Sequence, residues 1–248
     1  MGSELRVGTS GWSYKHWLKV FYPKLLKPQE WLAYYAQHFD TVEINNTFYH
    51  LPQESTVRNW YAIAPDGFLF AMKLSRFITH QKKLRRVDDA LEKFIERMAP
   101  LREKTGPILI QLPPNLLFDA ETAWSFFELI TRRLPNQRFA IEPRHESWFA
   151  EPCLELYREF NIALCMADSD NVFPELDRVT AGWIYLRFHG RDGLYQGNYT
   201  EAMLRPFARK IAFWLREGLD VFAYFNNDIA GFAVQNARLL REMLQKPL

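Results

Sequence analysis

The stretch RFAIEPRHESWFAEPCLELYREFNIALCMAD, residues 138–168, decides the fold. Its two ends, RFAIEPR (138–144) and IALCMAD (162–168), are short runs of apolar and β-branched residues, typical of buried strands. Residues 151–160 between them have the periodicity of an amphipathic helix. Two strands joined by a helical crossover lie parallel in one sheet. The segment therefore predicts a unit of a parallel α/β fold.

The same alternation of strand and helix runs along the whole chain. The 248 residues accommodate eight such units, at an average of 31 residues each, and no linker, low-complexity tract or charge block divides them. We therefore expect one domain over residues 1–248, a single (β/α)8 TIM-like barrel with eight parallel strands. The expected strands are residues 5–10, 41–45, 68–74, 107–112, 138–144, 162–168, 183–189 and 220–226.

Helices are expected between these strands, and one of them is weak. The segment SDNVFPELDRVTAG, residues 169–182, has little helical character, so the sixth helix is reduced to a short turn at most. The alternative fold is a doubly wound open sheet, although no GxGxxG or GxxxxGK[ST] turn supports a nucleotide-binding version of it. The other expected helices are residues 29–38, 55–64, 87–104, 120–134, 151–160, 200–217 and 233–245.

Composition restricts the class of protein more than it indicates a reaction. The formal net charge is only +2, so no global field requires a nucleic acid or a membrane as partner. Two cysteines are too few for a disulfide framework, and no apolar stretch approaches the length of a membrane span. The first residues contain no apolar signal core. We expect a cytoplasmic protein whose oligomeric state is open.

Polar residues close nearly every expected strand. In a parallel barrel both faces of a strand are covered, and side chains alternate between them, so Glu43 and Asn45 share one face, as do Glu142 and Arg144. Because unpaired buried charge is costly, we expect these side chains to meet at the carboxyl-end mouth, where water, an ion pair or a ligand satisfies them. A purely structural network, such as Glu43 with Lys73, is the alternative for any single residue.

Aromatic residues follow several of the same strands. Trp12 and Tyr14 lie in the first loop, Tyr49 follows the second strand and Trp148 follows the fifth. Rings beside charged groups can stack on a sugar face, a base or a cation. They are expected to form the rim of the mouth.

These residues favour a pocket for a polar anionic small molecule, such as a sugar phosphate or a carboxylate, with general acid–base chemistry. Arginines suit bidentate recognition of an anion, and a carboxylate among mixed charges can exchange protons near neutral pH. Whether the chain is an enzyme is left open by the residues. The expected catalytic set is Glu142, Asp168, His189 and Lys73, and the expected binding set is Glu43, Asn45, Arg76, Gln111, Arg144, His145, Arg187, Asn226, Asp228, Trp12, Tyr14, Tyr49 and Trp148.

Two other functions stay open at this point. A divalent-metal phosphoesterase or isomerase could use the acids and histidines at the strand ends, but no tight motif such as HExxH is present, and the nearby Arg and Lys oppose a cation. No metal and no cofactor are therefore expected. A protein that binds single-stranded nucleic acid could use the basic run of residues 82–86 along a phosphate backbone. The residues concerned are Glu142, His145, Asp168, His189 and Asp228 for the metal, and Lys82, Lys83, Arg85 and Arg86 for the nucleic acid.

Taken together, the motifs resemble one family over nearly the whole chain. The pattern GTSGWSY, FYP, VEINNTFY, FAMKLSRFITH, ILIQLPP, EPRHESW, YLRFHG and YFNND resembles the Domain of Unknown Function 72, or YecE-like, proteins. The resemblance implies a TIM-like barrel in the cytoplasm, without an established activity. Asn46 stands where the family usually has Ser, and Pro143 where it usually has an aromatic residue. Neither change removes a charged residue from a strand end.

Overall fold

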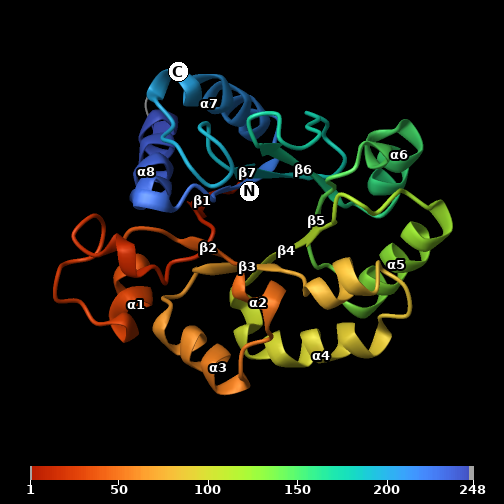
Figure 1. The fold of residues 1–248 in the computed structure, drawn as a ribbon, viewed down its shortest axis with the longest axis horizontal. Helices are drawn as coiled ribbons and strands as arrows, with labels where there is room; N and C mark the ends of the chain where they lie inside the picture. The colour runs from red at the N-terminus through yellow and green to blue at the C-terminus, as the bar shows by residue number, and fades with distance from the viewer. Residues whose placement is uncertain (1, 246–248) are drawn as a thin grey trace. The chain divides into compact units, whose positions relative to one another are not determined.

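Eight parallel strands alternate with helices in the computed structural model of the protein, which describes residues 2–245 (Figure 1). The strands follow the order β1-β8-β7-β6-β5-β4-β3-β2 in one sheet. They begin and end within two residues of the predicted bounds. The strands are β1 (Leu5–Thr9), β2 (Thr41–Ile44), β3 (Leu69–Lys73), β4 (Thr105–Gln111), β5 (Phe139–Glu142), β6 (Ala163–Asp168), β7 (Trp183–Phe188) and β8 (Asp220–Phe225).

This order of strands is that of a (β/α)8 barrel. Each strand pairs in parallel with the strands of the preceding and following units, as helical crossovers require. The first and last strands of the order come together at one point, where Ser10 forms a parallel bridge with Glu43. The predicted α/β TIM-like barrel is therefore confirmed.

The helices occupy the connections between the strands. The helix expected at residues 87–104 is shorter than predicted for a local reason. The long periodic segment 87–104 is divided at Pro100, because proline cannot donate the backbone hydrogen bond that would continue the α-helix. The α-helices are α1 (Trp31–Tyr35), α2 (Asn46–Tyr49), α3 (Glu54–Ile63), α4 (Asp88–Met98), α5 (Ala120–Arg133), α6 (Glu151–Glu159), α7 (Glu201–Arg216) and α8 (Phe232–Gln245), with short 3₁₀ turns η1 (Lys15–Trp17), η2 (Pro28–Glu30), η4 (Ala99–Lys104), η5 (Glu146–Phe149) and η6 (Ile229–Gly231) and one π-helical turn, η3 (Phe77–Gln81).

The connection between β6 and β7 has no helix, as the weak pattern of residues 169–182 predicts. Side-chain contacts to the backbone replace it. The Thr180 hydroxyl donates to the Ile162 carbonyl at 2.7 Å and accepts from the Leu164 amide at 2.8 Å. Asn161 accepts from the Gly182 amide at 3.0 Å. These bonds satisfy backbone groups that a helix would otherwise pair.

The described residues group into two compact units, and each is considered by itself. Unit 1 contains residues 2–43, 166–175 and 183–245, and unit 2 contains residues 44–165 and 176–182. In unit 1, α7 and α8 pack beside β8 and β1 (Figure 1). The expectation of one domain over the whole chain stays a prediction. No helix within residues 2–245 is both long and apolar enough to cross a bilayer.

Gly8 allows a close approach that positions the end of β1. A Cβ atom at this residue would lie 2.4 Å from the Thr41 carbonyl oxygen, which is inside any permitted contact. With glycine there, the Tyr35 hydroxyl donates to that carbonyl at 3.1 Å and accepts from the Thr9 amide at 3.0 Å. One phenol therefore fixes the backbone just before Ser10.

Candidate functional site

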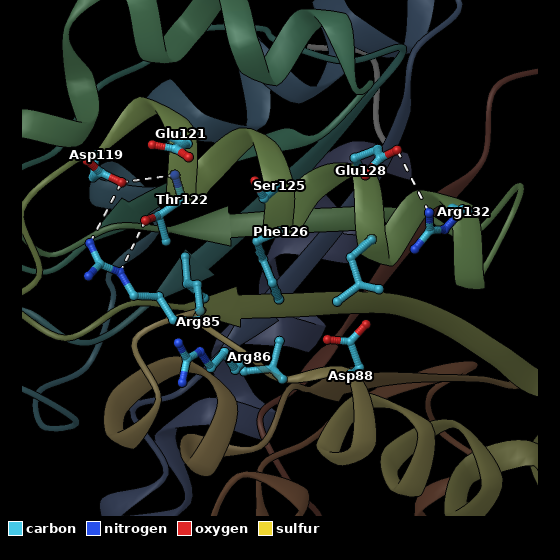
Figure 2. Close-up of a pocket in the computed structure, with 13 residues that line it drawn as sticks. Arg85, Arg86, Asp88, Asp119, Glu121, Thr122, Ser125, Phe126, Glu128 and Arg132 are labelled. Carbon is cyan, nitrogen blue, oxygen red and sulfur yellow. Dashed lines mark hydrogen bonds and ion pairs between the residues drawn. The ribbon is translucent and has the colours of Figure 1, made fainter.

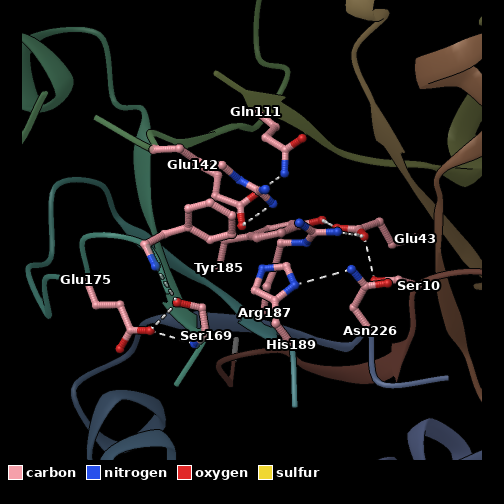
Figure 3. Close-up of polar contacts among 12 residues, drawn as sticks. Ser10, Glu43, Gln111, Glu142, Ser169, Glu175, Tyr185, Arg187, His189 and Asn226 are labelled. Atoms are coloured by element: carbon pink, nitrogen blue, oxygen red, sulfur yellow. Dashed lines mark hydrogen bonds and ion pairs between the residues drawn. The ribbon is translucent and has the colours of Figure 1, made fainter. Parts of the chain in front are cut away.

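A buried ion pair is the centre of the polar side chains in unit 1. Arg187 Nη2 lies 2.7 Å from Glu43 Oε1, and neither side chain is exposed to solvent. The Ser10 hydroxyl donates to Oε1 at 2.6 Å, and the Tyr185 hydroxyl donates to Oε2 at 2.7 Å (Figure 3). The register places Arg187 beside Tyr224 of β8. Tyr185 and Arg187 both reach Glu43, so they share one face of β7, as alternation along a strand predicts.

The surroundings of Glu43 keep it ionised. Burial raises the pKa of its carboxyl, but the opposite charge of Arg187 and the three hydrogen bonds outweigh burial, so the net pKa is lowered. Burial raises the pKa of Tyr185 well above its ordinary value, and that phenol remains a donor. The structure thus gives Arg187 an internal carboxylate as partner, where the sequence had suggested a ligand.

Two other predicted residues of unit 1, Asp168 and His189, are joined through the backbone. The His189 amide donates to the Asp168 carbonyl at 2.8 Å, and Asn226 Nδ2 lies 3.3 Å from His189 Nδ1. The Asp168 carboxylate lies 3.0 Å from Arg191. Burial raises the pKa of Asp168 more than Arg191 lowers it, so this carboxyl holds its proton more tightly than a free aspartate. Their catalytic roles stay a prediction.

The aromatic residues of the first loop hold two loops together. The Tyr14 hydroxyl donates to the carbonyl of Ser10 at 2.6 Å, and Ser10 is the residue whose hydroxyl donates to Glu43. Trp17 is fully buried, and its indole donates to the Asp228 carbonyl at 3.1 Å. Trp12 is also buried. Trp17 therefore positions the segment after β8, and Tyr14 positions the backbone at Ser10.

In unit 2, aromatic rings of α2 contact two cations, one at the end of β3 and one just after it. Lys73, the last residue of β3, is 8% exposed, and its ammonium lies 4.1 Å from the centre of the Phe48 ring. Arg76 lies over Tyr49 at 6.0 Å, and Tyr49 is 60% exposed. Thr47 fixes this arrangement, because its hydroxyl lies 2.7 Å from the Lys73 carbonyl.

His80 lies beside the same cations and was missed by the sequence analysis. Its ring packs edge-to-face on Phe48, with 4.9 Å between ring centres. Burial, together with the positive charges of Lys73, Arg76 and Arg144, lowers the pKa of His80 to about 4. The imidazole is therefore neutral at physiological pH. Its only sequence signal was its place at the end of FAMKLSRFITH.

Next to these cations, β4 and β5 place a carboxylate and an amide side by side. Gln111 and Glu142 are register partners, and Gln111 Nε2 donates to Glu142 Oε2 at 2.9 Å (Figure 3). The other carboxylate oxygen lies 3.9 Å from Arg144 Nη2.

We name Lys73, Arg76 and Arg144 the cationic cluster. Asn45 of the same unit has a buried Oδ1 that makes no hydrogen bond in the structure.

The last two predicted residues of unit 2 stabilise the loop after β5. Trp148 is 1% exposed, and its indole donates to the Leu116 carbonyl at 2.8 Å. His145 Nδ1 accepts from the Ser147 amide at 3.2 Å at the start of η5. Both contacts are those of a structural residue that caps or anchors a loop.

A cavity of about 520 Å³ lies elsewhere in unit 2, between α5 and the loop that precedes α4. Its lining mixes both charges, and Arg85 is already bound to Asp119 at 3.8 Å and to the Thr122 hydroxyl at 3.2 Å (Figure 2). Part of the basic run predicted for a phosphate backbone thus neutralises acids of this protein. We prefer the cationic cluster as the candidate site, because its three members carry one sign of charge and Lys73 is nearly buried, whereas the cavity lining mixes both signs.

Within residues 2–245, no three His, Cys, Asp or Glu side chains are grouped as a metal ion would need. The acids and histidines that the sequence proposed as metal ligands belong to two different units. Glu142 and His145 belong to unit 2, whereas Asp168, His189 and Asp228 belong to unit 1. The expectation of one shared hollow for both units stays a prediction.

The motifs and strand ends agree with a known family. The profile described as "Protein of unknown function DUF72" matches residues 6–248. The chain belongs to this family. It is 32% identical over 147 residues to UPF0759 protein YecE of Escherichia coli K12, a match that covers 58% of the chain but half the length of YecE.

Two further DUF72 relatives match over nearly their whole length. UPF0759 protein YunF of Bacillus subtilis is 25% identical over 96% of the chain and 94% of that protein. The crystal structure of a DUF72 family protein from Thermotoga maritima has a TM-score of 0.87 at 29% identity, covering 98% of this chain and 100% of that one. These names give the family and its fold, and the activity has to be argued from the residues.

The low pKa of His80 predicts how stability responds to acid. The unfolded chain binds a proton at this residue near pH 6.5, whereas the folded chain binds it only near pH 4. Stability should therefore fall as the pH falls between these values, because protons favour the unfolded state. In His80→Gln this decline should be shallower, measured by urea unfolding at pH 7 and pH 4.5. His50→Gln, which changes an exposed histidine, is the matched control, and equal declines in parent and H80Q would contradict the expectation.

Proposed function

We propose that this DUF72 protein binds a small polar anion at the carboxyl ends of β3 to β5, in unit 2, and acts on it by general acid–base chemistry. The observation that supports this is the position of Lys73 at the Phe48 ring, on which His80 also packs, with Arg76 over the neighbouring ring of Tyr49. Active sites of TIM-barrel proteins lie at the carboxyl ends of the strands, which is where these residues stand.

The cationic cluster has the charge to attract an anion. Arg76 is exposed and can meet a ligand from solvent, whereas Lys73 is nearly buried against the Phe48 ring. Arg144 lies 3.9 Å from Glu142 Oε1, which is a long ion pair. The planar guanidinium groups of Arg76 and Arg144 are suited to two-point contacts with such an anion.

Glu142 is the proposed acid–base group. Gln111 occupies one oxygen of its carboxylate at 2.9 Å and fixes the plane of the group. The other oxygen is on the Arg144 side, where a bound anion would lie. A carboxylate oriented by an amide and placed beside a bound substrate can accept and return a proton.

Asn45 adds a reason to expect hydroxyl or amine groups on the ligand. Its buried Oδ1 has no hydrogen-bond donor in the structure, and a buried acceptor without a donor is unfavourable by about 1–3 kcal/mol. A hydroxyl group of a ligand would satisfy it. This favours a polyhydroxylated anion over a simple fatty or aromatic acid.

The test is the affinity for small anions, measured by isothermal titration calorimetry with phosphate, sulfate, acetate and malonate. Lys73→Met removes one of the three cations and should weaken binding of the preferred anion about tenfold, since a hydrogen bond to a charged group contributes about 1.5–3 kcal/mol. Lys82→Met, which removes an exposed lysine beside the Phe77 ring, is the matched control and should bind like the parent. Equal losses in both variants, or none in K73M, would refute the proposal.

A further inference from the structure

We propose that unit 2 contains a second binding site, a cavity of about 340 Å³ that binds a small organic anion with an apolar body, such as an aromatic carboxylate. None of the residues that line this cavity belongs to the cationic cluster. The site is therefore independent of the function proposed above.

The cavity lies among the loops that follow β3, β4 and β5. Residues 81–85 come from the first of these loops, residues 115–117 from the second, and Trp148 from η5 after β5. These loops stand at the carboxyl ends of the strands, which is the end of the barrel where TIM-barrel proteins bind their ligands. The volume of about 340 Å³ is within the usual range of small-molecule sites.

Apolar side chains form one part of the lining. Trp148 is 1% exposed, Leu84 is 4% exposed, and Leu117 is 63% exposed at the edge of the cavity. The Trp148 indole is fixed, because it donates to the Leu116 carbonyl at 2.8 Å and packs against Phe118 with ring centres 5.1 Å apart. A ligand ring that covers Leu117 would remove apolar surface from water, which is favourable.

Positive charge at the cavity comes from Lys82, Lys83 and Arg85. Arg85 is held by Asp119 at 3.8 Å (Figure 2), and the Lys82 ammonium lies 5.6 Å from the centre of the Phe77 ring. The Lys83 side chain is exposed and forms no ion pair or hydrogen bond within residues 2–245. We therefore assign the ligand's negative charge to Lys83.

The backbone of the same loop separates the apolar and the charged side chains. Lys83 and Leu84 have left-handed φ values of 49° and 68°, which are uncommon for residues with a Cβ atom. Two hydrogen bonds of 3.0 Å hold this turn, from the Leu84 amide to the Ile78 carbonyl and from the Arg85 amide to the Lys82 carbonyl. Leu84 is thereby buried between two exposed cations. Apolar and cationic groups on consecutive residues suit an anion with an apolar body.

The experiment titrates the full chain with benzoate, benzamide and acetate, followed by ¹H–¹⁵N NMR. Benzamide lacks the charge and should bind about threefold more weakly than benzoate, whereas acetate lacks the ring and should bind at least tenfold more weakly. Benzoate should also shift the indole N–H signal of Trp148, which borders the cavity.

Variants locate the bound benzoate. Lys83→Met should weaken benzoate binding about threefold and leave benzamide unchanged, whereas Leu117→Ser should weaken both. Lys93→Met is the matched control, because Lys93 is an exposed lysine of α4 outside the cavity lining. Lys73→Met should also bind benzoate like the parent. Circular dichroism checks that each variant folds.

Four outcomes would overturn this site. They are the absence of saturable benzoate binding, acetate bound as tightly as benzoate, equal affinities in K83M and K93M, and a loss of benzoate binding in K73M alone. The last outcome would place the aromatic acid at the cationic cluster instead. None of the first three bears on the anion site of the proposed function, which is tested by K73M with small anions.

Discussion

Glu43→Gln is expected to destabilise the protein by about 3–5 kcal/mol, the amount typical of breaking a buried ion pair. The substitution keeps the shape of the side chain but removes its charge, and it leaves the Arg187 guanidinium in a place with no exposure to water. The Tyr185 and Ser10 hydroxyls, which both donate to the carboxylate, would then compete for the one remaining acceptor oxygen. The free energy of unfolding in urea measures the loss.

Glu54→Gln provides the matched control, because Glu54 pairs with Arg58 on the exposed surface of α3. Exposed pairs contribute about 0.5 kcal/mol or less, so this variant should unfold almost like the parent. A double variant, Glu43→Leu with Arg187→Met, should recover much of the stability that E43Q loses, since apolar replacements of a buried pair are often well tolerated. If E43Q unfolded like E54Q, the pair would not be the central contact of unit 1.

Trp17→Ala is the second large effect, with an expected loss of about 3–5 kcal/mol. The indole is fully buried and packs against several rings, with centres at 4.8 Å for Tyr14, 5.8 Å for Phe21 and 6.0 Å for Tyr22. Its removal would leave a large cavity and would also remove one of the two hydrogen bonds to the Asp228 carbonyl, the other being with His16 Nε2 at 2.8 Å. Thermal and urea unfolding both measure this loss.

The control is Trp124→Ala on α5, because Trp124 is half exposed and touches Phe160 only at its edge. It should cost about 1 kcal/mol or less. A tryptophan fluorescence spectrum separates the two positions, since loss of the buried indole removes a blue-shifted component and loss of the exposed one does not. A small effect of W17A would show that the first loop tolerates loss of its central ring.

The fold could be predicted because its signal is repeated. Each strand is short, apolar and followed by a polar end, and this pattern is set locally by burial on both faces of a parallel sheet. The weak segment before β7 could be predicted for the same reason, since residues 169–182 lack apolar periodicity. The break at Pro100 was overlooked because the apolar pattern continues through it.

The candidate site could be predicted only in part. Alternation along a strand places Glu43, Glu142 and Arg187 on inward faces, but it does not say which partner each charge takes. That choice depends on contacts between strands that are neighbours neither in the sequence nor in the sheet, such as that of Glu43 on β2 with Arg187 on β7. His80 was missed because its loop is not a strand end. Only the π-helical turn brings its ring onto Phe48.

The Phe48 ring contacts both Lys73 and His80, so it links the position of a positive charge to the orientation of an imidazole. The ammonium of Lys73 lies over this ring, and the imidazole of His80 packs edge-to-face with it. A substitution of Phe48 would therefore change the position of the Lys73 ammonium and the orientation of the His80 ring together. Relatives that change their preferred ligand should therefore be sought first among those with a different residue under the lysine, rather than among those that lose the lysine.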